Sequence, residues 1–278
     1  MRTMNRKYNV VESQSDTSNS TVASIEGSED LAVTWERLIP KQIADDPASQ
    51  KIFEIHFRRY ETAARYVRGK KVLDIACGAG YGSQMLGLAG ASAVVGVDIS
   101  PQTVQYASQH YQTPGVEFIC ADAEQFEWPE QFDVIVSFET IEHLQYPGKF
   151  LERIRSLLVP DGNFILSVPL GETRHVDRYH LHAFSQEDVF DLLEKAGFSV
   201  NRYRVDDWFM TRSDLLTWSR LYPAARPSFR EQYFTRLGWV LIRDFVFRGG
   251  VPFPQLLVAA RTNDSPVVKA RRTPQRLE

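Results

Sequence analysis

The stretch "KVLDIACGAGYGS", residues 71–83, joins an apolar run typical of a buried strand to a glycine-rich turn. Gly78, Gly80 and Gly82 lack a Cβ, so the backbone here can turn tightly and approach a ligand closely. A dinucleotide-binding turn has the pattern G-x-G-x-x-G, whereas here the third glycine follows the second after only two positions. The stretch therefore predicts the first strand and turn of a ligand-binding α/β unit, with a spacing that does not fit a dinucleotide.

The chain beyond this stretch alternates predicted strands and helices. Further apolar, strand-like runs cover residues 93–99, 116–122, 132–138, 163–169, 199–205 and 255–261. Helical patterns cover residues 82–90, 101–111, 147–158 and 185–196. This alternation predicts an α/β fold with a doubly wound, mostly parallel sheet of seven strands. Residues 207–250, rich in aromatic residues and arginine, are expected to form a helical insertion before the last strand, over the carboxyl end of the sheet.

Composition limits the class of protein. The 278 residues suffice for one domain with extensions, expected over residues 31–262 between a disordered tail at 1–30 and a basic disordered tail at 263–278. The net charge of -3 gives no electrostatic reason to expect nucleic-acid binding. The sequence shows neither a secretory signal nor an apolar run long enough for a membrane span. With two cysteines, which cannot form a disulfide framework, a reducing cytoplasm is the expected location; the oligomeric state is left open.

Three acidic residues lie at the ends of the first three predicted strands: Asp74, Asp98 and Asp122. Ligands of open α/β sheets bind beyond the carboxyl ends of the strands, so these carboxylates are expected to line one rim. A negative rim repels a pyrophosphate and favours a cationic nucleoside. Asp98 is placed to accept hydrogen bonds from a ribose diol, while Asp122 is expected near an adenine amino group and Asp74 near an ammonium group.

Four segments carry a family resemblance in their order along the chain. They are "VLDIACGAGYG", "VVGVDIS", "CADAEQF" and "FDVIVSFETIEHL", which begin at residues 72, 94, 120 and 132. Together they resemble the class I S-adenosylmethionine-dependent methyltransferases, over about residues 50–200. The resemblance implies a Rossmann-like fold and S-adenosylmethionine as the cofactor, which carries a sulfonium and an ammonium group but no phosphate.

The resemblance also implies roles for individual residues. Asp98 would hold the ribose hydroxyls, Asp122 and Ala123 the adenine, and residues 78–80 the methionine end. The full set of implied cofactor-binding residues is Asp74, Cys77, Gly78, Ala79, Gly80, Asp98, Ile99, Asp122, Ala123 and Phe138. Cys77 lies inside the glycine turn, where we interpret it as a small residue beside the cofactor and not as a nucleophile.

A second group of polar residues follows the strand at 132–138. If "ETIEH", residues 139–143, begins a helical turn, Glu139, Glu142 and His143 share one face. His175, His180 and His182 follow the next strand and are expected to meet that face above the sheet. Such a set could bind a divalent cation, or His143 could act as a general base.

The arrangement E-x-x-E-H with a downstream histidine resembles two subgroups of the family that bind a divalent metal. These are the ubiquinone-pathway O-methyltransferases and the small-RNA 2'-O-methyltransferases. The resemblance implies Glu139, Glu142, His143 and His180 as ligands of a metal such as Mg²⁺. Metal ligation, a metal-free base at His143 and purely structural roles all stay open, and His143, Glu139 and His180 are the candidate catalytic residues.

The predicted N-terminal helix and the insertion at residues 207–250 give indications about the acceptor of the methyl group. His56, Arg59 and Tyr60 lie on a predicted helix face that approaches the glycine turn. This N-terminal region resembles methyltransferases of bacterial polysaccharide and sugar-modifying pathways. Trp208, Phe209, Trp218, Tyr222, Arg212, Arg220 and Arg226 could cover a sugar or an anionic group, or simply pack as a helical cap. The leading hypothesis is O-methylation of a small molecule, with a sugar or a glycosylated acceptor as the expected substrate. RNA 2'-O-methylation, small-molecule N-methylation and a catalytically silent S-adenosylmethionine-binding module are the alternatives.

Overall fold

The fold is described from a computed structural model. It describes residues 31, 33, 37–171, 179–223, 239, 242–262 and 274–277. The strands are β1 (Lys71–Ile75), β2 (Ala93–Asp98), β3 (Val116–Cys120), β4 (Phe132–Phe138), β5 (Leu158–Pro169), β6 (Phe198–Thr211), β7 (Gly250–Thr262) and β8 (Gln275–Arg276). The helices are η1 (Pro40–Gln42), α1 (Pro47–Ala64), α2 (Tyr81–Leu88), α3 (Pro101–His110), α4 (Pro147–Leu157), α5 (Gln186–Lys195), α6 (Arg212–Leu221) and η3 (Asp244–Arg248).

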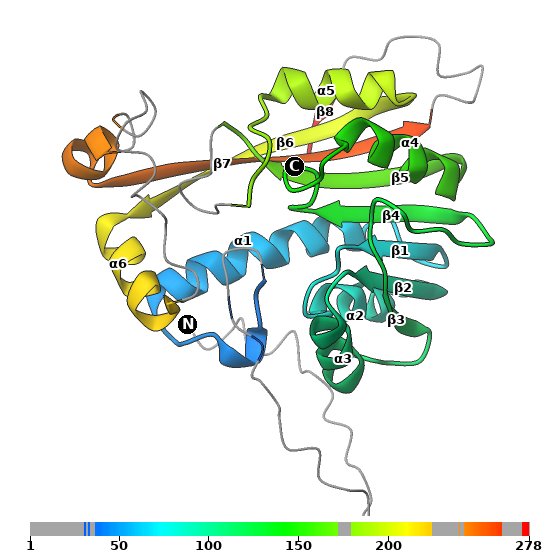
Figure 1. The fold of residues 1–278 in the computed structure, drawn as a ribbon, viewed down its shortest axis with the longest axis horizontal. Helices are drawn as coiled ribbons and strands as arrows, with labels where there is room; N and C mark the ends of the chain where they lie inside the picture. The colour runs from blue at the N-terminus through cyan, green and yellow to red at the C-terminus, as the bar shows by residue number, and fades with distance from the viewer. Residues whose placement is uncertain are drawn as a thin grey trace, which may run out of the picture. The chain divides into compact units, whose positions relative to one another are not determined.

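The strands form one sheet in the order β3-β2-β1-β4-β5-β7-β6-β8 (Figure 1). The pairs from β3 to β5 are parallel, and β7 runs antiparallel to both β5 and β6. The strand order reverses between β1 and β4, and ligands of such sheets bind in the crevice at that reversal. The predicted α/β class is confirmed, with eight strands in place of the seven expected.

Two apolar layers cover the two faces of the sheet. Alternate residues of β1 point to opposite faces, as strand geometry requires. Val72 packs in the cluster that includes side chains from α1, α2 and α6. Leu73 and Ile75 pack in the cluster that includes α4 and α5. The near-continuous apolar character of the parallel strands follows from this burial on both faces.

Helix starts agree with the signals in the sequence. Ser100 accepts a hydrogen bond from the N–H of Thr103 (3.3 Å) at the start of α3, and Pro101 occupies the first helical position. Ser185 and Asp188 form a reciprocal capping box at the start of α5. None of the described helices has the combination of length and apolarity that crossing a bilayer requires.

The region after β5 departs from the expectation in two places. Strand β6 continues to Thr211, because it pairs with β7 along its whole length, so the insertion expected at 207–250 begins with strand and not helix. Residues 274–277, expected to be disordered, include β8, which pairs with β6 and buries Leu277. The exposed edge of β6 offers backbone groups that the chain end can satisfy. The expectations for residues 1–30 and 263–273 lie outside the described residues.

Candidate active site

The turn after β1 is held in a conformation that few residues adopt. Ala76, Gly78 and Gly80 have positive φ values of 61°, 54° and 90°. A Cβ on Gly78 would meet no described atom within 4 Å, so this part of the turn faces open space. A Cβ on Gly80 would lie 2.6 Å from the Cβ of Ala107 and 2.9 Å from the ring of Phe118. Gly78 therefore presents bare backbone to a ligand, whereas Gly80 allows the turn to pack on α3 and β3.

The next glycine lies against a buried polar cluster. A Cβ on Gly82 would lie 1.9 Å from the ring of Tyr60, whose hydroxyl is 3.3 Å from both carboxylate oxygens of Asp74. Ser83 donates a hydrogen bond of 2.7 Å to the same carboxylate. Burial raises the pKa of Asp74 to about 7, although the hydrogen bonds from Ser83 and Tyr60 act in the opposite direction.

The position of Asp74 corrects the expected rim of three carboxylates. Asp74 is only 1% exposed and lies beneath the glycine turn, because its side chain points to the α1 side of the sheet. Asp98 is the last residue of β2 and Asp122 follows the adjacent strand β3, and both side chains are half-buried. The rim is thus formed by two carboxylates, and the third supports the turn from below.

The two rim carboxylates are held by backbone N–H groups. Asp98 accepts hydrogen bonds of 3.0 Å from the N–H of Gly78 and of 3.0 Å from the N–H of Ser100. Asp122 accepts from the N–H of Glu124 (2.9 Å) and from the amide of Gln125 (2.9 Å). Asp98 therefore fixes the glycine turn relative to β2, at the point where a ligand diol was expected.

The other residues of the predicted cofactor set differ in exposure. Cys77 is buried, and burial raises the pKa of its thiol well above the ordinary value, which keeps the thiol neutral. This supports the interpretation of Cys77 as a small packing residue. Ala79 and Phe138 are buried, Ala123 is half-buried, and the side chain of Ile99 is largely exposed.

Helix α1 closes one side of a cleft over the glycine turn. The cleft is lined by residues 76–79, by Phe138 and Glu139 after β4, and by His56, Arg59 and Tyr60 of α1. All three α1 side chains are buried, and Nδ1 of His56 lies 3.2 Å from the hydroxyl of Tyr81. The prediction that this face of the helix approaches the glycine turn is confirmed.

Glu139 lies in this cleft and not on a helical face with Glu142. Its backbone adopts a positive φ of 49°, and its carboxylate accepts from the hydroxyl of Ser167 (2.9 Å) and the amide of Gln255 (3.1 Å). Nη2 of Arg59 lies 3.3 Å from the same carboxylate. The structure therefore does not group Glu139 with the other three candidate metal ligands, since its left-handed backbone precedes the turn whose hydrogen bonds begin at Thr140.

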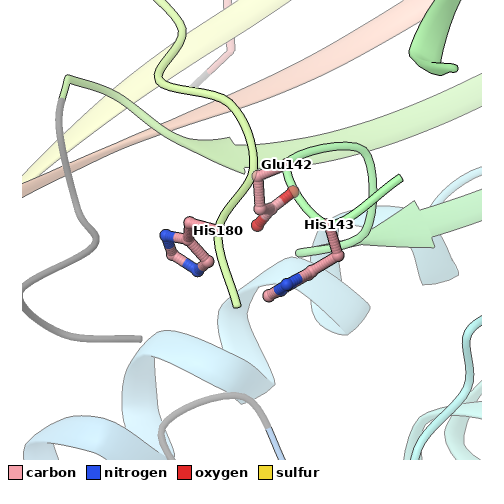
Figure 2. A group of neighbouring side chains, drawn as sticks. All are labelled: Glu142, His143 and His180. Carbon is pink, nitrogen blue, oxygen red and sulfur yellow. The ribbon is translucent and has the colours of Figure 1, made fainter. Parts of the chain in front are cut away.

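Glu142, His143 and His180 converge, as Figure 2 shows. One ligand atom from each of the three side chains lies within 4.8 Å of the others, and the two imidazole centroids are 4.8 Å apart. The backbone N–H groups of Leu181 and His182 donate to the carbonyl of Glu142 and join the two loops. The predicted meeting of the two histidine segments is confirmed for His180 and His182, whereas His175 lies outside the described residues.

The tautomer of His143 follows from its neighbour. Nδ1 of His143 lies 3.3 Å from the carbonyl oxygen of Tyr179, which can only accept a hydrogen bond. Nδ1 is therefore the protonated nitrogen of the neutral ring, and Nε2 carries the lone pair. A lone pair on Nε2 suits either a metal ligand or a general base.

The donor set at this cluster can be compared with the chemistry of divalent metals. Glu142 and His180 are buried and His143 is half-buried, and together they offer one carboxylate oxygen and two imidazole nitrogens. Magnesium prefers oxygen ligands, whereas zinc, manganese and iron accept mixed nitrogen and oxygen sets. The three residues fit a borderline divalent metal better than the Mg²⁺ that the sequence suggested.

Some of the aromatic residues expected to face an acceptor are packing residues. Trp218 is fully buried and Tyr222 nearly so, with ring centroids 4.3 Å apart. Trp208 and Phe209 are half-buried on β6, and a guanidinium lies over each ring, from Arg58 and Arg248 respectively. Arg212 and Arg220 are exposed on α6, and Arg226 lies outside the described residues.

Gln255 and Ser167 belong to the site but were not predicted. Ser167 reaches Glu139 because β5 is parallel to β4, with Ser167 opposite Phe138. Gln255 reaches it because β7 lies antiparallel to β5, with Gln255 opposite Pro169. The sequence holds no local signal for the register of β5 and β7, since eighty residues separate the two strands. The apolar run at residues 255–261 predicts a strand in the sequence but not its partner.

Comparison with known proteins decides the family. Residues 73–166 match the family described as the methyltransferase domain. Ubiquinone biosynthesis O-methyltransferase of Haemophilus ducreyi is 30% identical over 173 residues, which cover 59% of this chain and 69% of that relative. The chain belongs to the class I S-adenosylmethionine-dependent methyltransferases.

Two further comparisons extend this result. The chain is 32% identical over 157 residues to ubiquinone biosynthesis O-methyltransferase of Pseudomonas putida, covering 55% of this chain and 63% of the relative. It therefore spans less than two thirds of that relative's length. The solved structure of YcgJ protein from Bacillus subtilis superposes with a TM-score of 0.60 at 18% identity, covering 76% of this chain and 100% of the other. At that identity the likeness shows the shared fold.

Proposed function

We propose that this methyltransferase transfers the methyl group of S-adenosylmethionine to a hydroxyl of a small molecule, a sugar or a glycosylated acceptor. The observation that carries the proposal is the cluster of Glu142, His143 and His180. Two of its members, Glu142 and His143, follow the cleft-lining residue Glu139 by three and four positions, a span of at most about 14 Å. In this proposal the acceptor hydroxyl lies between the cleft and His143, which takes its proton.

The residues around the glycine turn fit the cofactor. Gly78 offers bare backbone facing open space, and Asp98 lies at the end of β2 with its carboxylate beside that backbone. In this proposal Asp98 holds the ribose, Ile99, Asp122 and Ala123 border the adenine, and the turn holds the methionine end. Asp74 acts from beneath the turn, while Cys77, Ala79, Gly80 and Phe138 shape its walls.

Methyl transfer to a hydroxyl requires that the cluster of Glu142, His143 and His180 take up a proton. The carbon–sulfur bond breaks as the carbon–oxygen bond forms, sulfur leaves as a neutral thioether, and the hydroxyl proton needs an acceptor. Nε2 of His143 is the proposed acceptor, because the carbonyl of Tyr179 holds the ring proton on Nδ1. Alignment can contribute up to about 7–11 kcal/mol, so enclosure by α1 matters at least as much as the base.

A divalent metal is the second way in which this cluster can serve an O-methyltransferase. Glu142, His143 and His180 would hold the ion, and the metal would supply Lewis acidity toward an acceptor hydroxyl. In that case Glu139 would not be a metal ligand. It would keep its ion pair with Arg59 and its hydrogen bond from Gln255, and would line the cleft.

Three observations support the acceptor class. Two relatives carry the name ubiquinone biosynthesis O-methyltransferase, which indicates a hydroxyl acceptor in those proteins. Trp208 provides a half-buried aromatic ring on β6, with the guanidinium of Arg58 on one face, of the kind that can stack on a sugar ring. A hydroxyl acceptor is also what requires the proton acceptor at His143, whereas an amine requires it less.

The test is transfer of a tritiated methyl group from S-adenosylmethionine to a panel of sugars, glycosides, catechols and amines. We expect His143→Asn to lower turnover by about 10²–10⁴-fold, with unchanged cofactor affinity by calorimetry. The matched control is His110→Asn, an exposed histidine at the end of α3. Binding of the cofactor without transfer to any acceptor would contradict the proposal and favour a silent binding module.

Chelation separates the two roles of the cluster. If His143 acts as a base without metal, exhaustive chelation leaves turnover unchanged. If the cluster is a metal site, chelation removes activity, and zinc or manganese restores it more readily than magnesium. Loss of restoration in both Glu142→Gln and His180→Asn would assign the ligands.

A further inference from the structure

The segment between β6 and β7 differs in charge from the rest of the chain. Residues 212–248 contain seven arginines against three acidic residues, a surplus of four positive charges in a protein whose net charge is -3. The same segment contains eight aromatic residues. Basic and aromatic residues are thus concentrated in one part of a chain that is otherwise acidic.

The described end of this segment exposes apolar side chains. We call residues 239 and 242–248 the basic tip. Phe247 is 82% exposed, Trp239 62% and Val246 48%. Arg243 and Arg248 flank Val246 and Phe247 in the sequence, and both arginines pair with Asp244, at 2.9 Å and 3.1 Å. Large apolar side chains next to exposed arginines are more typical of an interaction surface than of a surface in contact with water alone.

The basic tip lies beyond the carboxyl ends of the parallel strands. Pro169, the last residue of β5, pairs with Gln255, whereas β6 and β7 continue their pairing to Thr211 and Gly250. Five further residues of strand correspond to about 17 Å. Figure 1 shows η3, drawn in orange, at the far end of these two long strands, on the side where α6 lies.

We propose that the basic tip docks on an anionic lipid surface. Aromatic side chains suit the interface between headgroups and acyl chains, and arginines beside them are attracted by anionic lipids. The exposed aliphatic side chain of Val246 beside Phe247 fits the lipid interface, whereas a single-stranded nucleic acid would favour stacking faces alone. Exposed Arg212 and Arg220 of α6 add positive charge from the same insertion.

The experiment is co-sedimentation of the full chain with phosphatidylcholine vesicles, with and without phosphatidylglycerol. We expect binding only with phosphatidylglycerol, weakened by added salt. Phe247→Asp and Val246→Asp should each lower partitioning about tenfold or more, since each loses apolar burial and gains an unfavourable charge. The matched control is Leu88→Asp, which changes a 62% exposed leucine at the end of α2 and should bind as the unmodified chain does.

Three results would overturn the proposal. The first is equal sedimentation with and without phosphatidylglycerol, and the second is unchanged binding of both tip variants. The third is that Phe247→Asp abolishes binding of a single-stranded RNA oligomer or self-association by analytical ultracentrifugation while vesicle binding persists. The result does not depend on the proposed methyl transfer, because vesicle binding is measured without cofactor or acceptor.

Discussion

The two sides of the strand reversal between β1 and β4 are stabilised differently. On the β1–β3 side, Asp98 is held by backbone N–H groups of Gly78 and Ser100, twenty and two positions away in sequence. On the β4–β7 side, Glu139 is held by side chains from α1 and β7, including Gln255, which is 116 positions away. The side proposed to hold the cofactor, here called the cofactor side, is therefore built from contacts between segments at most twenty residues apart. The side proposed to hold the acceptor, here called the acceptor side, is built from contacts between distant segments.

The buried carboxylate under the glycine turn gives the largest expected effect. Because burial raises the pKa of Asp74 from its ordinary value of 3.8 to about 7, the folded chain binds a proton that the unfolded chain releases. Its contribution to stability is present below pH 4 and is lost as the pH rises through 7, by up to about 4 kcal/mol. The difference in free energy of unfolding between the unmodified chain and Asp74→Asn should shift by about 3 kcal/mol between pH 4.5 and 8, since the unfolded carboxyl is already largely ionised at pH 4.5.

Urea unfolding of both proteins at the two pH values measures this shift. The comparison with Asp74→Asn is needed because other carboxylates, such as Asp188, have lowered pKa values and change stability in the opposite sense. A pH dependence identical in the two proteins would show that Asp74 is ionised throughout, in contact with solvent or a cation.

The rim carboxylate gives the next largest effect, on cofactor affinity. Asp98→Ala removes the acceptor that holds Gly78 and would hold the ribose, so we expect at least a hundredfold weaker S-adenosylmethionine binding by calorimetry, about 2.7 kcal/mol. Asp206→Ala, which removes a carboxylate paired with Arg204 on β6, should leave affinity unchanged. Equal losses in both variants would show that the two sides are not separable.

The same contrast explains what could be predicted from the sequence. The parallel strands, α3 and α5 were visible because apolar runs and caps such as Ser100 and Ser185 act over a few residues. The meeting of His143 with His180 was also predictable, because both follow adjacent parallel strands whose ends share one edge. These features follow from short sequence signals and from the side-by-side arrangement of consecutive parallel strands.

The errors share the opposite cause. Glu139 was placed on a helical face, but a positive φ at a glutamate has no sequence signal, and its conformation accompanies contacts with Arg59 and Gln255. The strand β8, Gln275–Arg276, lies in the stretch expected to be a basic disordered tail, and its pairing with β6 overrides that composition. Asp74 was assigned to the rim because the strand end could not be located to within one residue.

Packing of the glycine turn gives an intermediate effect. Gly82→Ala places a methyl group on the ring of Tyr60, where a Cβ would be 1.9 Å from the nearest ring atom. We expect a loss of about 1–3 kcal/mol in free energy of unfolding. Gly148→Ala in α4 is the matched control, since its Cβ would meet no described atom within 4 Å, and it should be neutral or stabilising by up to about 1 kcal/mol. Equal stability of the two variants would show that Tyr60 moves freely away from the turn.

The smallest effect concerns the tie between α1 and α6 on the acceptor side. Lys51 donates to the carboxylate of Asp214 at 2.7 Å and to the carbonyl of Phe209 at 3.1 Å. Lys51→Met keeps the apolar stem and removes this partly exposed pair, so we expect a loss of about 1 kcal/mol or less in urea unfolding. Asp214→Ala should cost about 1 kcal/mol more, because Asp214 also completes the capping box with Thr211. If Lys51→Met costs as much as Asp214→Ala, the ion pair and not the cap stabilises α6, and the acceptor side depends on tertiary contacts even for its helix start.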